Sequence, residues 1–276
     1  GNVTIGGTLT YEDVTNIDVV GVSTFAGRMN VNSTLEINEG LNATAGVATF
    51  ANGLKVSGSQ LLVGTGVTIG VAGIATFRSG RIDVGDSLNN TSIGEGAGDA
   101  YTTGHGNIAV GVGALTANTT GYNNTSLGRS ALAVNTTGYE NVAVGPYALD
   151  ANVGAAQNTA MGYAALSANV SGTRNTGLGY GALSANTSSY NTAVGYNALY
   201  ANTTGGSNVA VGYESLDANT TGESNASLGP WSLTANTTGS YNNAIGRSAL
   251  GANTTGSNNV ALGRNCLSSN TTANDN

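Results

Sequence analysis

The chain has 276 residues, of which only 8% are charged, and its formal net charge is −7 at pH 7. An ordinary soluble domain has about 25% charged residues, so the polarity of this chain comes from Asn, Thr, Ser and Gly instead. Because there is no basic stripe to neutralise phosphates and no apolar run near the ~18 residues of a membrane span, we expect neither nucleic-acid binding nor membrane insertion.

Residues 1–89 carry a loose repeat. The segments Gly21–Phe25, Gly46–Phe50 and Gly73–Phe77 share the pattern Gly-Val/Ile-Ser/Ala-Thr-Phe and recur at spacings of 25 and 27 residues. Each is followed by a short stretch of alternating apolar and polar residues, which predicts pairs of strands. We therefore expect a β-rich region over 1–89, with a boundary within Asp86–Asn90.

Residues 90–276 consist of eleven copies of one segment, close to Asn-x-Ala-Val-Gly-x-x-Ala-Leu-x-Ala-Asn-Thr-Thr-Gly-x-x. We number its positions from one to seventeen, starting at the first Asn. Successive copies begin seventeen residues apart, except that sixteen residues separate Asn175 from Asn191. Such a repeat indicates units that cannot bury an apolar face alone and must stack on their neighbours. Asn276 falls where a twelfth copy would begin, so we expect the molecule to continue.

The composition of the repeat favours strands and turns over helices. Seventeen residues leave no room for two packed helices, and Gly, Asn and Thr are poor helix formers. Val209 and Val211 alternate around the small Ala210, which is the period of a strand. We therefore predict an all-β fold, a parallel β-solenoid or β-roll with one coil per copy. With coils about 4.8 Å apart, the stack would be roughly 50 Å long.

Gly at position five and Asn at position twelve are expected to mark two turns. The Gly should end the strand at a positive φ, or at a close backbone approach that a Cβ would forbid. The Asn opens the turn Asn-Thr-Thr-Gly, and stacked copies should hydrogen-bond along the array as a side-chain ladder. The structural residues are Gly111, Gly128, Gly145, Gly162, Gly179, Gly195, Gly212, Gly229, Gly246, Gly263, Asn118, Asn135, Asn202, Asn219, Asn236 and Asn253.

The core of each coil is expected to be thin. It should bury mainly one Leu, one or two Val and several Ala. The free energy gained by burying this small apolar area is modest beside the conformational entropy lost when a whole coil is ordered. Self-association would add burial, and the small residues at position three, such as Ser92, Ala109 and Gly177, would let backbones of several chains approach closely. We therefore predict a parallel homotrimer.

The repeats resemble those of two families of fibrous proteins. Asn141–Gly145 and Asn208–Gly212 read Asn-Val-Ala-Val-Gly, which resembles the Ser-Val-Ala-Ile-Gly core of the shorter head repeats in YadA-like trimeric autotransporter adhesins. The full form, as in Asn191–Gly205, is similar to arrays in tail-fibre proteins of tailed bacteriophages, and Gly6–Asp18 resembles fibre-like virion proteins of marine phages, especially those of cyanobacteria. These resemblances imply an intertwined trimeric β-shaft over 1–89 and a location in the virion.

No catalytic pattern accompanies the repeat. Asp150 and Asp217 share position ten but lie four copies apart. His105 lies in a Gly-rich turn and Cys266 occupies a slot where most copies have Ala, so we expect an exposed turn residue and a packed apolar residue. We predict no enzymatic activity, cofactor or metal.

The resulting functional prediction is a structural fibre or shaft segment that supports host attachment, as part of a phage tail fibre or virion appendage. Its partners would be further copies of the chain, other fibre or virion proteins and a host-surface glycan. The alternative is a bacterial trimeric surface adhesin or an extracellular filament subunit, located at the cell surface.

Position six is Tyr in four successive copies, directly after the constant Gly. Stacked, these rings would form a row that either contacts a glycan or packs on itself and shields the edge of the coil. The candidate glycan contacts are Tyr163, Tyr180, Tyr196 and Tyr213, with Tyr147 and Trp231 as extensions.

Many of the position-twelve Asn residues match the N-glycosylation sequon. Repetition alone explains these matches, and an Asn that faces inward could not be modified, so we expect no glycan. The matching residues are Asn118, Asn135, Asn169, Asn186, Asn202, Asn219, Asn236, Asn253 and Asn270.

Overall fold

The computed structural model describes residues 87–276, which comprise the seventeen-residue repeats and the three residues before them. This range contains eleven short strands joined by turns, and no helix. The predicted β-shaft over 1–89 lies almost entirely outside the described residues. The strands are β1 (Thr91–Ile93), β2 (Ile108–Val110), β3 (Thr125–Leu127), β4 (Val142–Val144), β5 (Thr159–Met161), β6 (Thr176–Leu178), β7 (Thr192–Val194), β8 (Val209–Val211), β9 (Ala226–Leu228), β10 (Asn243–Ile245) and β11 (Val260–Leu262).

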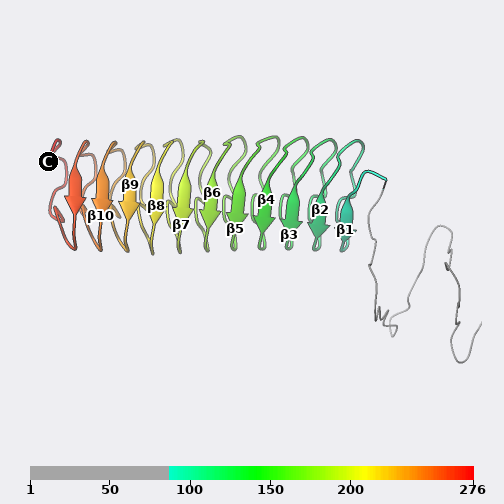
Figure 1. Ribbon diagram of the computed structural model, residues 1–276, viewed down its shortest axis with the longest axis horizontal. Coiled ribbons are helices and arrows are strands. Elements are labelled where there is room, and N and C mark those ends of the chain that lie inside the picture. The colour runs from blue at the N-terminus through cyan, green and yellow to red at the C-terminus, as the bar shows by residue number, and fades with distance from the viewer. Residues whose placement is uncertain (1–86) are drawn as a thin grey trace, which may run out of the picture. The chain divides into compact units, whose positions relative to one another are not determined.

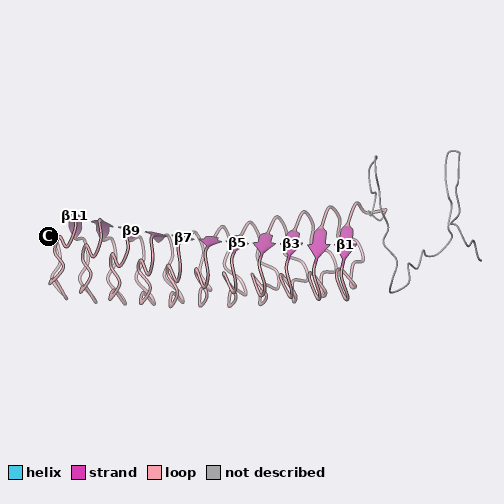
Figure 2. Cartoon of the chain, turned by 90° about the horizontal axis from the view of Figure 1, so that it is seen from below, coloured by secondary structure: helices cyan, strands magenta, loops and turns pink. Residues whose placement is uncertain are grey.

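The eleven strands form one parallel sheet in chain order, from β1 to β11. Each strand pairs with the same positions of the next copy, as Val142 does with Thr159 and Ala143 with Ala160. Figure 1 shows a row of similar coils, each with one strand, and Figure 2 shows the strands along one side of the row and the returning loops on the other. The predicted all-β parallel solenoid, with one coil per copy, is confirmed.

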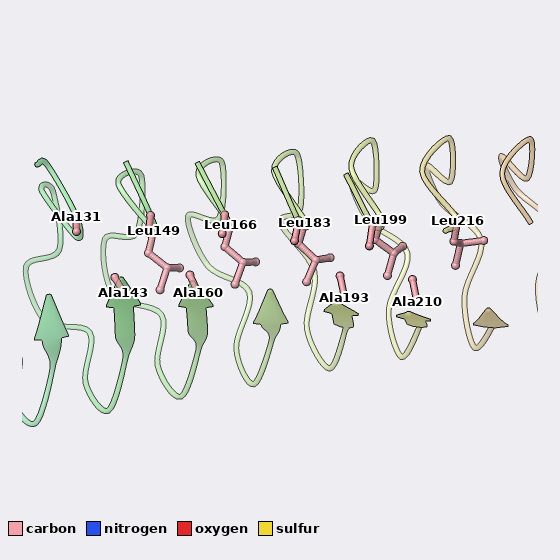
Figure 3. Packing of buried hydrophobic residues seen from close by; sticks show 14 of the residues in the cluster. Ala131, Ala143, Leu149, Ala160, Leu166, Leu183, Ala193, Leu199, Ala210 and Leu216 are labelled. Atoms are coloured by element: carbon pink, nitrogen blue, oxygen red, sulfur yellow. The ribbon is translucent and has the colours of Figure 1, made fainter. Parts of the chain in front are cut away.

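The core of each coil is formed by the middle residue of the strand and an Ala-Leu pair on the returning segment. In one coil, Ala143, Ala148 and Leu149 have no exposed surface. Figure 3 shows the Leu side chains pointing toward the strand Ala residues, coil after coil, as for Leu166 and Ala160. These side chains form one cluster that runs along the stack. Each coil therefore buries its apolar residues against its neighbours as well as within itself.

Two expectations about this packing are wrong. Val209 and Val211 are each 38% exposed, whereas Ala210 between them is completely buried. Neighbouring strand residues point to opposite faces, and the interior has room only for the small one, because a Cβ on Gly177 would already lie 3.4 Å from Cγ of Leu166. Position three therefore packs inside its own coil and cannot admit a second chain, and the Val residues lie outside the core.

The core Leu has a backbone conformation that its residue type does not suggest. Leu149 has a φ of 51°, in the left-handed region, which costs an L-residue roughly 1–2 kcal/mol. Its amide donates to the carbonyl of Ala165 in the next coil at 3.1 Å, and that of Ala148 to Gly145 at 3.3 Å. The burial of the Leu149 side chain and the hydrogen bond from Leu149 to Ala165 in the next coil offset the cost of this backbone conformation.

The glycine after each strand is confirmed as a turn residue. Its φ ranges from 120° at Gly263 to 141° at Gly195. A Cβ on Gly195 would also lie 2.3 Å from the carbonyl oxygen of Gly212 in the next coil. Both predicted reasons for glycine, a positive φ and a close approach of backbones, therefore hold at this position.

The predicted Asn ladder at position twelve is present. The side-chain amide of Asn135 donates to Oδ1 of Asn118 at 2.6 Å and to the carbonyl of Gly138 at 3.1 Å. The ladder is interrupted after Asn152, whose Oδ1 has no hydrogen-bond partner within residues 87–276. The next turn departs from the Thr-Thr-Gly sequence there, with Val153 in the place of Thr.

A second Asn ladder, at position one, was not predicted. The backbone amide of Asn124 donates to Oδ1 of Asn107 at 3.0 Å. Its side-chain amide donates to the same oxygen at 3.1 Å and to the carbonyl of Gly138 at 2.8 Å. Each of these buried Asn residues thus connects the strand, the preceding coil and the second turn.

The sixteen-residue copy keeps the strand register. Thr176 pairs with Thr192 and Leu178 with Val194, as in every other pair of coils. The missing residue lies in the second turn, where Ser188 takes the place of Gly and accepts the side-chain amide of Asn175 at 2.8 Å. The deletion is therefore absorbed at the surface.

Candidate functional site

The outer side of the sheet is an uncharged and largely apolar surface, which we call the outward sheet face and define as strand positions two and four. Position four is apolar in all eleven copies, and neither position carries a charged side chain. Parallel sheets are ordinarily covered on both faces, and contiguous apolar surfaces mark interaction sites. Its exposed large side chains are Ile93, Ile108, Leu127, Met161, Val209, Val211, Leu228, Ile245, Val260 and Leu262.

The Tyr residues at position six form the stacked row that the sequence predicts, and we call the four of them the tyrosine ladder. The ring centroids of Tyr163 and Tyr180 are 5.2 Å apart, those of Tyr180 and Tyr196 5.3 Å, and those of Tyr196 and Tyr213 5.2 Å. The interplanar angles are between 9° and 13°. Each side chain is 44–50% exposed.

The ladder ends in the same way on both sides. Tyr147 meets Tyr163 edge-on at 5.8 Å, and Trp231 meets Tyr213 edge-on at 5.4 Å. Both terminal aromatics are at position seven, each directly after a proline. A guanidinium covers each of them: Arg129 lies 5.5 Å from the Tyr147 centroid, and Arg247 lies 4.9 Å from that of Trp231. The six candidate residues therefore belong to one continuous row.

This geometry defines which parts of the rings are available to a ligand. The rings of Tyr180 and Tyr196 face ladder neighbours on both sides, so nothing can be inserted between them at a centroid spacing of 5.2–5.3 Å. A sugar would meet ring edges and phenol hydroxyls rather than ring faces. The glycan contact stays a prediction, and the ladder also packs on itself and shields the edge of the coil.

A second aromatic row at position sixteen was not predicted. His105 stacks on Tyr122 at 5.3 Å, and Tyr122 stacks on Tyr139 at 4.8 Å. His105 is exposed, as expected of a turn residue. The signal for this row in the sequence is the recurrence of aromatic residues at position sixteen of three successive copies.

Side chains at position seventeen, or its equivalent in the shortened copy, connect four successive coils. Gln157 donates to Glu140 at 3.0 Å, Arg174 donates through Nε to Gln157 at 2.9 Å, and its Nη1 donates to the hydroxyl of Tyr190 at 2.7 Å. All three contacts are exposed, so they contribute little to stability.

The carboxylates beside the ladder serve as hydrogen-bond acceptors. Glu214 accepts Nε1 of Trp231 at 3.0 Å, and Asp217 accepts the hydroxyl of Thr234 at 2.8 Å. The hydrogen bond to Glu214 is the main cause that raises the pKa of Tyr213, with burial and nearby negative charge adding to it. Burial raises the pKa of Asp217 above its ordinary value, and it does the same for Asp150.

The remaining sequence candidates are placed as follows. Cys266 is partly buried and packs against the core cluster, as expected. Position-twelve residues of the sequon are buried from Asn118 to Asn253, and their amide groups donate within the coil. No group of three or more His, Cys, Asp or Glu side chains within residues 87–276 is arranged to hold a metal ion.

No family model, curated protein or solved structure matches the chain. In the part of the chain that the structure describes, no helix has the length and apolar character needed to cross a bilayer.

Proposed function

We propose that the chain is a non-enzymatic structural segment of a fibre, in which three parallel copies associate through the outward sheet face. The observation that carries the proposal is this face itself, an uncharged and largely apolar surface that follows a long stack of coils. The assignment to a phage tail fibre or virion appendage that supports host attachment rests on the sequence resemblance. The bacterial surface adhesin is the alternative.

The size of the outward sheet face favours association with copies of the same chain. Eleven strands of three residues cover roughly 50 Å by 10 Å. Two such faces together bury on the order of 1,000 Å², about the lower limit for a specific interface. An unpaired face of this size on a monomer would be an aggregation liability.

The identity of the partner follows from the repeat. A second copy has the same coil spacing and the same uncharged residues, so it can match this face coil for coil without placing like charges opposite each other. Val211 and Leu228 lie in the neighbouring strands β8 and β9, away from both ends of the stack, where an interface would be drier than at its ends.

The proposal is tested by the mass of the chain in solution. Light scattering after size exclusion should give three times the chain mass of 27.2 kDa. The double variant Val211→Lys and Leu228→Lys should be monomeric, because each ammonium group would otherwise be desolvated. Thr204→Lys with Thr221→Lys places the same charges at exposed turn positions and should leave the trimer intact.

Two results would overturn parts of the proposal. A monodisperse wild-type monomer at all concentrations would exclude the trimer. An antibody against residues 90–276 should label a filamentous appendage on virions; labelling of a bacterial envelope instead would favour the adhesin.

A further inference from the structure

The tyrosine ladder, Tyr163, Tyr180, Tyr196 and Tyr213, brings together phenol side chains that the proposed structural role does not require. We propose that it is a site of oxidative modification, at which neighbouring rings couple to dityrosine and covalently join successive coils. The inference concerns the chemistry of the ladder alone and is independent of whether the chain is a trimer or a fibre.

The spacing of the rings favours coupling between neighbours. In three successive pairs the ring centroids are 5.2–5.3 Å apart, and the two rings of each pair come from adjacent coils. Dityrosine is a bond between ring carbons ortho to the two hydroxyls. Rotation about the side-chain bonds can bring these carbons together, because the backbones that carry them are only about 4.8 Å apart. Holding two reactants this close raises their effective concentration by many orders of magnitude.

The ladder is also accessible to an oxidant. All four side chains are 44–50% exposed, and their ring edges face outward because the ring faces are stacked. An oxidised ring therefore always has another ladder ring beside it. Two radicals formed anywhere in the row can become neighbours through electron exchange between stacked rings.

The reaction needs a one-electron oxidant of the peroxidase class together with hydrogen peroxide. Each of two phenols loses one electron and its phenolic proton and becomes a phenoxyl radical. The radicals form a carbon–carbon bond at their ortho positions, and each ortho hydrogen then moves to the phenol oxygen through solvent. The peroxidase passes the two electrons to hydrogen peroxide, which takes up the two protons and becomes two molecules of water. In sum, two tyrosines and one hydrogen peroxide give one dityrosine and two waters.

Other tyrosines of the same chain supply an internal comparison. Tyr200 is 46% exposed and Tyr241 is 53% exposed, so both are as accessible as the ladder. Neither has an aromatic ring contact within residues 87–276. If exposure alone decided where links form, Tyr200 and Tyr241 would react as readily as the ladder. If the proximity of the rings decides it, coupling within one chain is confined to stacked pairs.

The test treats the dilute full chain with a haem peroxidase and hydrogen peroxide. Dityrosine fluorescence should appear in chains that keep the mass of a single chain on a denaturing gel, with the loss of two hydrogens for each link. Peptide mapping should place the links at Tyr163–Tyr180, Tyr180–Tyr196 and Tyr196–Tyr213 in the ladder, and also at Tyr122–Tyr139, another stacked pair of tyrosines in residues 87–276.

A pair of matched variants separates proximity from exposure. Tyr180→Phe with Tyr213→Phe keeps the stacked rings but leaves no two adjacent phenols in the ladder, so the yield of ladder links should fall roughly tenfold or more. Tyr200→Phe with Tyr241→Phe removes as many phenols and should leave that yield unchanged. Circular dichroism is the check that both variants fold.

The proposal is wrong if the links map to Tyr200 and Tyr241 as often as to the ladder, or if they form only between chains. It is also wrong if the peroxidase oxidises the chain without producing any link between ladder residues.

Discussion

The side-chain amide of Asn219 donates to Oδ1 of Asn202, one coil earlier, at 2.8 Å. Asn236 repeats the contact with Asn219 at 2.8 Å, and all three side chains are completely buried. Each amide in the row is therefore a donor to one neighbour and an acceptor from the other. The ladder fills part of the coil interior with side-chain amides in place of apolar side chains. The hydrogen bonds of these buried amides are complete only while every member of the ladder is present.

Removing one member of this ladder should be strongly destabilising. Asn219→Ala leaves Oδ1 of Asn202 without its donor and the side-chain amide of Asn236 without its acceptor on Asn219, whereas the carbonyl of Gly222 still accepts from Asn208. At about 1–3 kcal/mol for each buried group left unpaired, we expect a loss of roughly 3 kcal/mol in denaturant unfolding. Thr221→Ala, at an exposed turn position two residues away, should change stability by less than about 0.5 kcal/mol. Equal losses in the two variants would show that the ladder is not important for stability.

Two turn glycines allow the cost of backbone strain to be measured separately from the cost of a steric clash with the next coil. Gly195→Ala places a Cβ 2.3 Å from the carbonyl oxygen of Gly212, whereas a Cβ on Gly263 meets nothing within 4 Å. Both residues have a φ that an L-residue rarely adopts. Gly263→Ala should therefore cost about 1–3 kcal/mol from strain, and Gly195→Ala clearly more. The melting temperatures of the two variants provide the comparison, and similar values would argue against the close approach of coils.

One glycine should be replaceable with a gain. Gly177 occupies strand position three, where the neighbouring coils have Ala160 and Ala193, and its φ is not in the left-handed region. A Cβ there would lie 3.1 Å from the carbonyl oxygen of Ala182, so the returning segment must shift by a few tenths of an ångström, and both neighbouring coils hold an Ala at this position. We expect Gly177→Ala to stabilise the fold by about 0.4–1 kcal/mol, because it restricts the unfolded chain.

Gly181→Ala is the control for that substitution, because Gly181 has a φ of 63° and a Cβ there would lie 2.5 Å from Oδ1 of Asn197. It should lower the unfolding midpoint. A loss of stability in both variants would mean that the coil interior at Gly177 is tighter than the neighbouring coils indicate.

Burial of the Asp217 carboxyl predicts a dependence of stability on pH. Burial raises its pKa, the hydrogen bond from Thr234 opposes the shift, and the charge of Glu214 adds to it. The folded chain therefore holds the proton more tightly than the unfolded chain does. Protonation stabilises the fold fully below the unfolded pKa, and this contribution is lost as pH rises through the folded pKa.

Asp217→Asn removes the charge but keeps an oxygen that can accept from Thr234 at its present 2.8 Å. The variant should melt at a higher temperature than the wild type at neutral pH, and the difference should vanish below about pH 3, where the carboxyl is protonated. Asp275→Asn, at an exposed position, is the matched control. A difference in melting temperature that persists at low pH would rule out the charge as its cause.

The sequence predicts those parts of the fold that depend on local chemistry and register. Gly195 could be placed in a turn and Asn202 in a ladder because few other residues suit a positive φ or a stacked amide row. Tyr180 could be placed on Tyr196 because equal positions of successive coils must be neighbours.

The direction of the strand side chains was not predictable in the same way. Alternation shows that Ala210 and Val211 lie on opposite faces, but it does not tell which face is inside. The space inside the coil decides this, since the Leu from the returning segment already fills it. That Leu, with φ near 50°, gives no local signal because Leu is not a residue that favours the left-handed region.

Each strand contacts only the strand before it and the strand after it. The shortened copy between Asn175 and Asn191 shows that the pairing survives a change in the turn. A whole coil can thus be lost or duplicated without creating any new kind of contact, and the length changes by about 4.8 Å each time. Because the copies share their turn and core residues, the gain or loss of one copy would change the length of the array in steps of one coil and leave the contacts between the remaining coils as they are.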